Sequence, residues 1–121
     1  MPSEDEWEYA ARATRWTEER QWDSGSNGGK ENCTYAASNN CTGSNPDPVA
    51  KTGRKPNAWG LYDMIGNVWE WTATPGGSGR VVRGGSFDSN DDYLRLSARY
   101  AYTPGRRNDG NGVRVFARID L

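Results

Sequence analysis

Helical spacing is visible near the start of the chain, at one set of positions. They are four residues that share one face at a spacing of 3.6 residues: Trp7, Ala10, Ala11 and Thr14. Ser3, followed three residues later by Glu6, has the pattern of a capping box, and the acidic first turn suits a helix N-terminus. The sequence therefore predicts a short helix over residues 3–14.

The rest of the chain has the character of short strands separated by loops. Residues 21–57 are rich in Gly, Ser, Asn, Thr and Pro without any period, which is typical of a fold built around ordered loops. A turn is expected over residues 74–79, where Pro and Gly cluster. Strands are expected over four segments: residues 68–72, 80–83, 94–102 and 113–119. Together these elements predict an α+β fold in a single domain over residues 1–121.

Composition indicates where the core comes from. Ile, Leu, Val and Phe make up only 14 of the 121 residues, but six Trp and six Tyr can each bury a large area. We therefore expect a globular domain whose core is aromatic rather than aliphatic. The candidate core aromatics are Trp7, Trp59, Trp69 and Trp71.

The absent residues exclude most enzyme classes. The chain has no His, which excludes histidine-based triads, general bases and metal sites. Its two cysteines, Cys33 and Cys41, either close a short disulfide loop or are free thiols in a reducing compartment. The net charge of −1 gives no reason to expect a nucleic-acid partner. Without a signal-like start or a run of 18 apolar residues, we expect a soluble protein without membrane insertion, whose compartment is unknown.

Five segments carry a resemblance to one family: Pro2–Arg12 (PSEDEWEYAAR), Asn57–Met64 (NAWGLYDM), Gly66–Trp71 (GNVWEW), Arg83–Ser86 (RGGS) and Gly112–Val115 (GVRV). The chain resembles the sulfatase-modifying, formylglycine-generating-enzyme type of domain, which has a C-type-lectin-like fold. Two departures are visible. The earlier half of the family has no counterpart here, and its usual Gly-Phe-Arg is Gly-Val-Arg at residues 112–114. The resemblance implies a minimal version of that fold.

The same resemblance implies that the chain is not an enzyme. The formylglycine-generating branch has two catalytic cysteines in a copper site after the Gly-Gly-Ser motif. Matching that motif places Ser89 and Leu94 at the two positions, and neither side chain can supply a thiolate. The related sulfoxide synthases need histidine-bound iron, which a chain without His cannot build. An oxidase of the formylglycine-generating type remains the less favoured alternative.

The C-terminal third has an unusual composition. Nineteen of the first 80 residues are Glu, Lys, Gln, Met or Trp, whereas none of the residues from Arg83 to Leu121 is. These five types are the ones that cannot be reached when the first two bases of an Asn codon ending in C are randomised. The pattern resembles the variable proteins of diversity-generating retroelements, which use the same fold and adenine-directed mutation. The alternative is a lectin-like structural or binding member of the family without diversification.

The candidate variable region spans residues 87–111. Its expected ligand-binding residues are Phe87, Asp88, Ser89, Asn90, Tyr93, Tyr100, Tyr102, Arg106, Asn108, Asp109 and Asn111. Tyr, Ser and Asn are typical of adaptable binding surfaces, so the three tyrosines are expected to contribute most of the binding energy, with Arg106 as a charged anchor. Because Tyr100 and Tyr102 share one face of a strand, packing of both into the core is the alternative. The expected partner is an unknown protein or cell-surface ligand.

The resemblance also implies a calcium site. Asp63, Gly66, Val68 and Glu70 fall on a site known in the family, with two carboxylates and two backbone carbonyls as ligands. The alternative is a solvated turn in which Glu70 is hydrogen-bonded to backbone. No cofactor is required for binding, and calcium is the one candidate.

Overall fold

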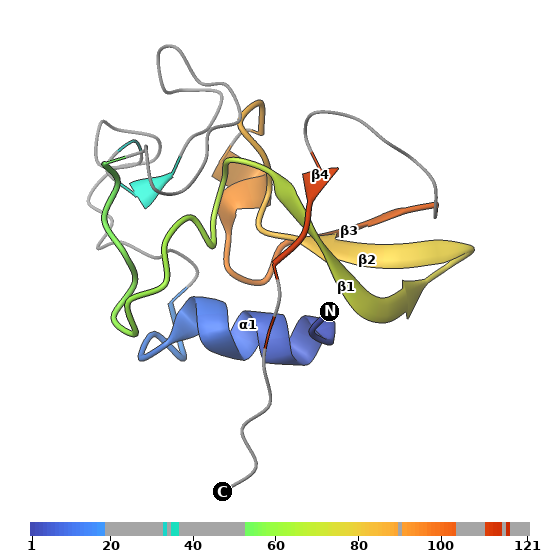
Figure 1. Ribbon diagram of the computed structural model, residues 1–121, viewed down its shortest axis with the longest axis horizontal. Helices are drawn as coiled ribbons and strands as arrows, with labels where there is room; N and C mark the ends of the chain where they lie inside the picture. The colour runs from blue at the N-terminus through green and yellow to red at the C-terminus, as the bar shows by residue number, and fades with distance from the viewer. Residues whose placement is uncertain are drawn as a thin grey trace, which may run out of the picture.

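The predicted N-terminal helix is present as α1 (Glu4–Arg12) in the computed structural model of the protein (Figure 1). The structure describes residues 1–18, 33, 35, 36, 53–89, 91–103, 111–114 and 116. The capping box is confirmed, because Ser3 Oγ accepts from the Glu6 amide at 3.1 Å and Glu6 Oε1 accepts from the Ser3 amide at 3.0 Å. The helix ends earlier than predicted, since Ala13 takes a positive φ of 53° and Thr14 is exposed.

A mixed four-stranded sheet lies beside the helix. Its strands are β1 (Trp69–Gly76), β2 (Gly79–Arg83), β3 (Arg99–Tyr102) and β4 (Asn111–Gly112), in the spatial order β3-β2-β1-β4. β1 and β2 form an antiparallel hairpin, β3 is antiparallel to β2, and β4 is parallel to β1. One helix with this sheet confirms the predicted α+β class.

Three strand predictions are wrong in their bounds. The strand expected over residues 68–72 continues in β1 to Gly76, which takes in the first part of the turn expected over residues 74–79. In residues 94–102 only the second half is a strand, because the 3-10 helix η2 (Asp91–Leu94) ends where the strand was expected to begin. Leu94, the last residue of η2, and Leu96, in the loop after it, alternate like strand residues, but both side chains are fully buried in the core. At the C-terminal end β4 precedes the predicted segment 113–119, of which only residues 113, 114 and 116 are described.

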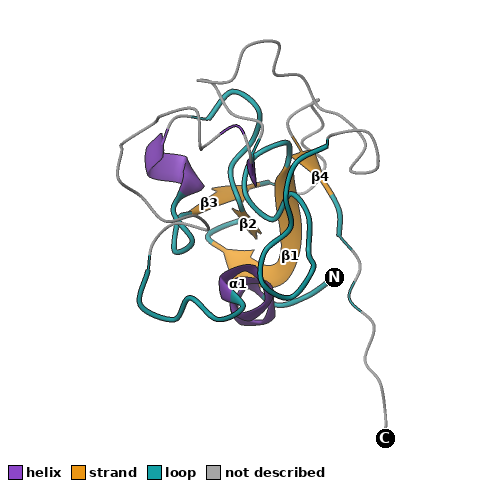
Figure 2. Ribbon diagram, turned by 90° about the vertical axis from the view of Figure 1, so that its left-hand side faces the viewer, coloured by secondary structure: helices purple, strands orange, loops and turns teal. Residues whose placement is uncertain are grey.

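The two faces of the sheet have different roles. Residues paired across antiparallel strands share a face, so the pairs Trp71–Val82 and Val82–Tyr100 place these three residues on one side. On the other side Arg83 lies 5.2 Å over the ring of Trp7, which belongs to α1. Both views show α1 packed along this second face (Figures 1 and 2). The face that carries Tyr100 is not covered by the helix.

The core lies between α1, the sheet and the loops, and it is more aliphatic than predicted. Its fully buried members include Met64, Ile65, Leu94 and Leu96 around Trp7. Trp59 is not in the core, which corrects the prediction: it is 44% exposed and packs against Tyr9 and Trp16, with ring centroids 5.1 and 5.9 Å away. Leu94 and Leu96, together with Met64 and Ile65, therefore supply the buried apolar area that the sequence pattern assigns to that tryptophan.

A buried arginine ties α1 to the sheet and to the loop before β3. Arg83 forms ion pairs with Glu4 at 3.3 Å and with Glu8, and its Nη2 donates to the Leu96 carbonyl at 2.8 Å. We call this group the Arg83 clamp: Arg83, Glu4, Glu8 and the Leu96 carbonyl. Glu4 also binds Arg99, the first residue of β3, through two hydrogen bonds of 2.9 and 2.7 Å. The N-terminal helix thus fixes the start of the strand that carries Tyr100.

β3 also packs very closely on the hairpin. A Cβ placed on Gly79 would lie 1.9 Å from the carbonyl oxygen of Tyr102. Only glycine allows this approach, so the position of β3 depends on a residue in the hairpin.

Two further findings concern residues singled out in the sequence. Cys33 is disulfide-bonded, and Cys41, the other cysteine of the chain, lies outside the described residues. In the part of the chain that the structure describes, no helix has the length and apolar character needed to cross a membrane.

Candidate functional site: an aromatic face

Five aromatic rings from three elements meet on the face of the sheet that α1 leaves open. We call them the aromatic face: Trp69 and Trp71 of β1, Tyr93 of η2, and Tyr100 and Tyr102 of β3. Tyr100 is central, with ring centroids 6.2 Å from Trp69, 6.4 Å from Tyr93 and 5.2 Å from Tyr102. Trp69 contacts Tyr93 at 5.8 Å, and Trp71 contacts Tyr102 at 6.1 Å. Most of these pairs are edge-on or tilted, the geometries that aromatic quadrupoles favour.

These rings differ in exposure, and the exposed tyrosines rest on a buried tryptophan. Trp69 is 6% exposed, whereas Tyr93 and Tyr100 are 41% and 48% exposed. The alternative that both β3 tyrosines pack into the core is therefore wrong for Tyr100, and Tyr102 is half-buried. The structure brings together the three tyrosines that the sequence predicted as the main binding residues.

The loop after β2 contributes fewer exposed side chains to the candidate site than the sequence predicts. Phe87 is half-buried and Asp88 is exposed, with the Asp88 carboxylate accepting from Ser86 Oγ at 2.6 Å. Ser89 is only 6% exposed, and its hydroxyl oxygen accepts from the Ser86 amide at 2.9 Å. Ser89 thus supports the loop and is removed from the set of surface residues.

Asn111 lies on the same side of the sheet as Trp69 of the aromatic face. It is paired with Trp69 in the sheet, and both side-chain polar atoms are buried without a hydrogen-bond partner in the described structure. The remaining predicted residues lie outside the described part of the chain: Asn90, Arg106, Asn108 and Asp109.

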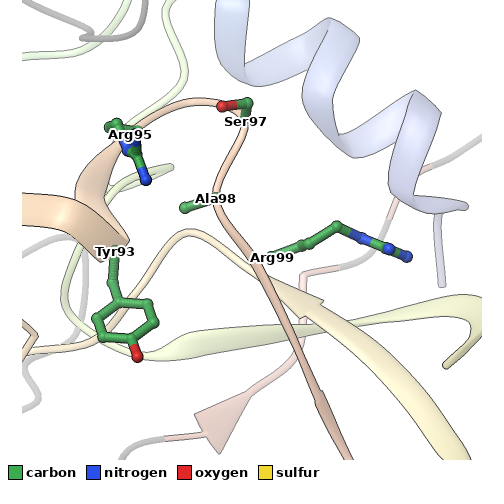
Figure 3. A pocket seen from close by; sticks show the side chains of 5 residues that line it. All are labelled: Tyr93, Arg95, Ser97, Ala98 and Arg99. Atoms are coloured by element: carbon green, nitrogen blue, oxygen red, sulfur yellow. The ribbon is translucent and has the colours of Figure 1, made fainter. Parts of the chain in front are cut away.

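Two hollows flank β3 and were not predicted from the sequence. The larger, of about 490 Å³, is lined by Tyr93, Arg95, Ser97, Ala98 and Arg99 (Figure 3). The smaller, of about 260 Å³, is lined by Gly76, Gly77, Val81, Arg99, Tyr100 and Ala101. They could not be predicted because they depend on how the loop before β3 folds.

The two positions that the resemblance matched to catalytic cysteines do meet in space. A Cβ placed on Gly85 would lie 3.1 Å from Leu94 Cδ2 and 3.4 Å from Ser89 Cβ, so both side chains border the same glycine. Leu94 is fully buried in the core. A hydroxyl and an alkyl group in this place provide no thiolate for a soft metal or for nucleophilic chemistry.

The two carboxylates of the predicted calcium site are bound to arginines. Asp63 Oδ1 accepts from Arg54 Nε at 2.5 Å. Glu70 Oε1 accepts from Arg114 Nε at 2.7 Å and from Trp7 Nε1 at 3.2 Å. Arg114 Nη2 also donates to the carbonyls of Tyr62 and Asp63, at 2.7 and 3.1 Å. Guanidinium groups thus take up the carboxylate oxygens that a calcium ion would need.

The electrostatics of Glu70 agree with a structural role. Burial raises the pKa of this carboxyl, while the hydrogen bonds from Arg114 and Trp7 act to lower it. Within the described residues no group of three or more His, Cys, Asp or Glu side chains is placed to hold a metal ion. A calcium ion bound by Asp63, Gly66, Val68 and Glu70 would have to displace the guanidinium groups of Arg54 and Arg114 from the two carboxylates.

We expect the thermal stability of the protein to be unaffected by calcium. An ion at 100 times its Kd would stabilise the fold by about 2.7 kcal/mol, which would raise the Tm by several degrees. Thermal unfolding followed by circular dichroism, with calcium or with EDTA, should give the same Tm. A rise of several degrees with calcium would show that the ion displaces the arginines.

Comparison with known proteins identifies the family. Residues 1–119 match the sulfatase-modifying factor enzyme 1-like domain, so the chain belongs to this family. It is 31% identical to the formylglycine-generating enzyme of Streptomyces coelicolor over 148 residues, covering 100% of this chain and 47% of that protein. It is 32% identical to the inactive C-alpha-formylglycine-generating enzyme 2 of Mus musculus over 130 residues, covering 94% of this chain and 41% of that protein. The chain thus spans less than half the length of these relatives.

The fold is similar to that of solved structures, one of which is a variable protein. Treponema denticola variable protein 1 matches with a TM-score of 0.74 and 35% identity, over 93% of this chain and 45% of that one. PvdO from Pseudomonas aeruginosa matches with a TM-score of 0.70 and 25% identity, over 93% of this chain and 50% of that one. These similarities confirm the predicted fold and the resemblance to variable proteins.

Proposed function

We propose that this chain is a non-catalytic binding module whose aromatic face recognises a protein or cell-surface ligand. The observation that carries the proposal is the convergence of Tyr93 and Tyr100, from two different elements, on one exposed patch above the buried Trp69. Contiguous exposed aromatic rings are typical of interaction sites, and Tyr is the residue type that provides rigid contact area at low entropic cost.

The surroundings of Gly85 support a role without catalysis. Ser89 and Leu94 border that glycine, so the place where the enzymatic branch has its cysteines is filled by a hydroxyl and a core leucine. The relative of Mus musculus, described as inactive, shows that the family includes members without the enzymatic activity. Oxygen consumption during conversion of a cysteine-containing sulfatase peptide to formylglycine would contradict this part of the proposal.

We further propose that residues 87–111 are diversified by a retroelement. The absence of Glu, Lys, Gln, Met and Trp from Arg83 to Leu121 supports this, as does the similarity to a variable protein of Treponema denticola. Sequencing the DNA around the gene tests it. The expected result is a neighbouring reverse transcriptase gene and a near-copy of the 3′ coding region that differs only at adenines. Isolates with identical codons 87–111 and neither element would leave a lectin-like binding domain without diversification.

Replacing the exposed tyrosines should change binding without unfolding the protein. We expect Tyr93→Ser and Tyr100→Ser each to weaken binding of a ligand at this surface by roughly tenfold or more, as for central aromatic contacts. The matched control is Tyr62→Ser, since Tyr62 is 41% exposed like Tyr93 but is not part of the aromatic face. Binding is measured by surface plasmon resonance with a ligand selected against the folded protein, and folding by circular dichroism. Equal effects of all three substitutions would contradict the assignment of the site.

A further inference from the structure

A second group of exposed aromatic rings lies at the end of α1, apart from the aromatic face. Its members are Tyr9 of α1, Trp16 from the bend after the helix, and Trp59, which are 60%, 52% and 44% exposed. Each ring contacts the other two, with centroids 5.3 Å apart for Tyr9–Trp16, 5.1 Å for Tyr9–Trp59 and 5.9 Å for Trp16–Trp59. We call these three residues the helix-end cluster. Contiguous exposed aromatic side chains of this kind are typical of interaction sites.

A buried side chain fixes Trp59 in the cluster. Asn57 is 8% exposed, and its Nδ2 donates to the Ala10 carbonyl, in the last turn of α1, at 2.8 Å (Figure 1). Its Oδ1 accepts from the amides of Trp59 and Leu61, both at 3.0 Å. The segment before β1 is thus fastened to the end of α1, and the exposed ring of Trp59 has a defined place beside Tyr9.

The bend that carries Trp16 is fastened to the helix as well. Arg12 Nη1 donates to the Glu18 carbonyl at 2.5 Å and to the Arg15 carbonyl at 3.3 Å. Arg12 Nε donates to Glu8, one turn earlier in α1, at 3.0 Å. The backbone on both sides of Trp16 is therefore bound to one helical side chain, so the three rings form a supported surface.

The surroundings of the cluster are negatively charged. Residues 1–18 and 53–63, which contain the cluster, have six acidic and four basic side chains. Arg15, next to Trp16 in the sequence, is half-buried, whereas Asp5 is exposed and lies one turn before Tyr9 on the same face of α1. The C-terminal end of the helix dipole, at which the cluster lies, is also negative. A cationic group is thus the charged group that this surface attracts.

α1 already holds one guanidinium group on an aromatic ring. The guanidinium carbon of Arg83 lies 5.2 Å from the centroid of the Trp7 ring, and the same group forms ion pairs with Glu4 and Glu8. A cation within about 6 Å of a ring centroid is attracted by the negative face of the ring. The helix-end cluster offers the same two components, aromatic rings and a nearby carboxylate, but offers them to solvent.

The size of the cluster argues against a second copy of the chain as its occupant. Three aromatic side chains of roughly 200 Å² each, about half exposed, offer roughly 300 Å². A stable interface between two proteins needs about 800 Å² on each partner. The cluster is large enough for a few side chains of a ligand and too small to hold a dimer together.

We propose that the helix-end cluster is a second binding site, which takes an arginine side chain from an exposed segment of a partner polypeptide. The guanidinium group stacks on the exposed tryptophan rings, and Asp5 supplies the opposite charge. Arginine is favoured over lysine because its planar group stacks on aromatic rings and is more weakly hydrated. This site goes beyond the proposed function and does not depend on it. Its residues all precede residue 87, so diversification of residues 87–111 would leave it unchanged.

A peptide selection tests the proposal on the intact protein. Nine-residue peptides with a fixed central arginine are displayed on phage, selected on the protein and counter-selected on the double variant Trp16→Leu/Trp59→Leu. Trp16→Leu alone replaces the double variant if circular dichroism shows that the latter does not fold. The tightest peptide is then synthesised with arginine, lysine or citrulline at the centre, since citrulline keeps the planar shape and removes the charge. Isothermal titration calorimetry gives the Kd of each peptide.

We expect the citrulline peptide to bind roughly tenfold more weakly than the arginine peptide, and lysine to lie between them. Trp16→Leu and Trp59→Leu should each weaken binding of the arginine peptide by roughly tenfold, and Asp5→Asn by roughly threefold. The matched control is Tyr62→Leu, because Tyr62 is 41% exposed and lies outside the helix-end cluster. It should leave the Kd unchanged.

Three results would overturn the inference: no enriched peptide, equal Kd values for the arginine and citrulline peptides, or equal weakening by Tyr62→Leu and Trp59→Leu. Binding that is lost in Tyr93→Ser and Tyr100→Ser but kept in the two tryptophan variants would also overturn it, and would assign the peptide to the aromatic face. A ligand of the aromatic face that ignores those two tyrosines would contradict the proposed function and leave the helix-end cluster untouched. The two proposals therefore fail on different variants.

Discussion

Arg83→Met should be among the most destabilising substitutions in the chain. Arg83 is 2% exposed and forms the centre of the Arg83 clamp, where it binds Glu4, Glu8 and the Leu96 carbonyl. Removing one partner of a buried ion pair costs about 3–5 kcal/mol. We expect the lower end of that range, because Glu4 keeps Arg99 and Glu8 keeps Arg12 as partners. Urea denaturation followed by tryptophan fluorescence measures the loss in the free energy of unfolding.

The matched control is Arg80→Met. Arg80 is on the same strand, is exposed, and donates to the Ala73 carbonyl at 2.8 Å. An exposed substitution of this kind usually changes stability by less than about 0.5 kcal/mol. Similar losses for the two variants would mean that the clamp contributes little.

Arg83→Met should also change how the free energy of unfolding depends on pH in the acidic range. Burial acts to raise the pKa of Glu8, but the hydrogen bonds and charges of Arg83 and Arg12 outweigh it and hold the pKa below its ordinary value of 4.5. A carboxyl with a lowered folded pKa stabilises the protein above the unfolded pKa, and that stabilisation is lost as the pH falls through the folded pKa. The native protein should therefore lose stability below about pH 4.5, and Arg83→Met should lose less over the same interval. Unfolding curves at several pH values test this, and parallel losses in both proteins would contradict it.

Gly84→Ala should lower the free energy of unfolding about as much as Arg83→Met, for a steric reason. Gly84 has a φ of +97°, and a Cβ there would lie 2.6 Å from the Met64 carbonyl oxygen and 3.0 Å from Trp7 Cζ2. Strained backbone of this kind costs about 1–3 kcal/mol, and overpacking of a core adds about 1–3 kcal/mol. We expect a loss of about 4 kcal/mol in the free energy of unfolding, together with a change in the environment of Trp7 that its fluorescence would report.

Gly77→Ala separates the two contributions. Gly77 also has a positive φ, of +59°, but nothing lies within 4 Å of a Cβ placed there. This variant should lose only the conformational part, about 1 kcal/mol. A loss as large as that of Gly84→Ala would show that the contact with α1 and Met64 is not what makes position 84 intolerant.

The helix, the hairpin and the family motifs could be predicted because each depends on local pattern. Ser3 and Glu6 form the capping box within one turn, and the Gly-Asn-Val-Trp-Glu-Trp segment precedes and enters β1. The loop before β3 could not be predicted in the same way. Leu94 and Leu96 alternate as strand residues do, but Leu94 ends the 3-10 helix η2 and Leu96 follows it in a loop. Both are buried by tertiary packing, which local propensity does not describe.

The candidate site was predictable in its residue types but not in its shape. Tyr93, Tyr100 and Tyr102 were singled out for their chemistry, and the structure brings their rings together. Ser89 looked like a surface residue but is buried, because a small hydroxyl serves equally well to support a turn. Arg54 pairs with Asp63, and Arg114 pairs with Glu70. The two arginines are distant from each other in the sequence, so no local spacing indicates that both carboxylates form ion pairs.

The close approach of Gly79 to Tyr102 has a consequence for how the chain tolerates mutation. Gly79, like Glu4 and Arg83, lies before residue 87, so these supports of β3 are encoded outside the candidate variable region. Changes confined to codons 93 and 100 alter exposed side chains, while the glycine that seats the strand and the glutamate that holds its first residue are inherited unchanged. A large share of the variants in a library built at those two codons should therefore still fold. Differences in ligand binding among these variants would then reflect recognition and not loss of folding.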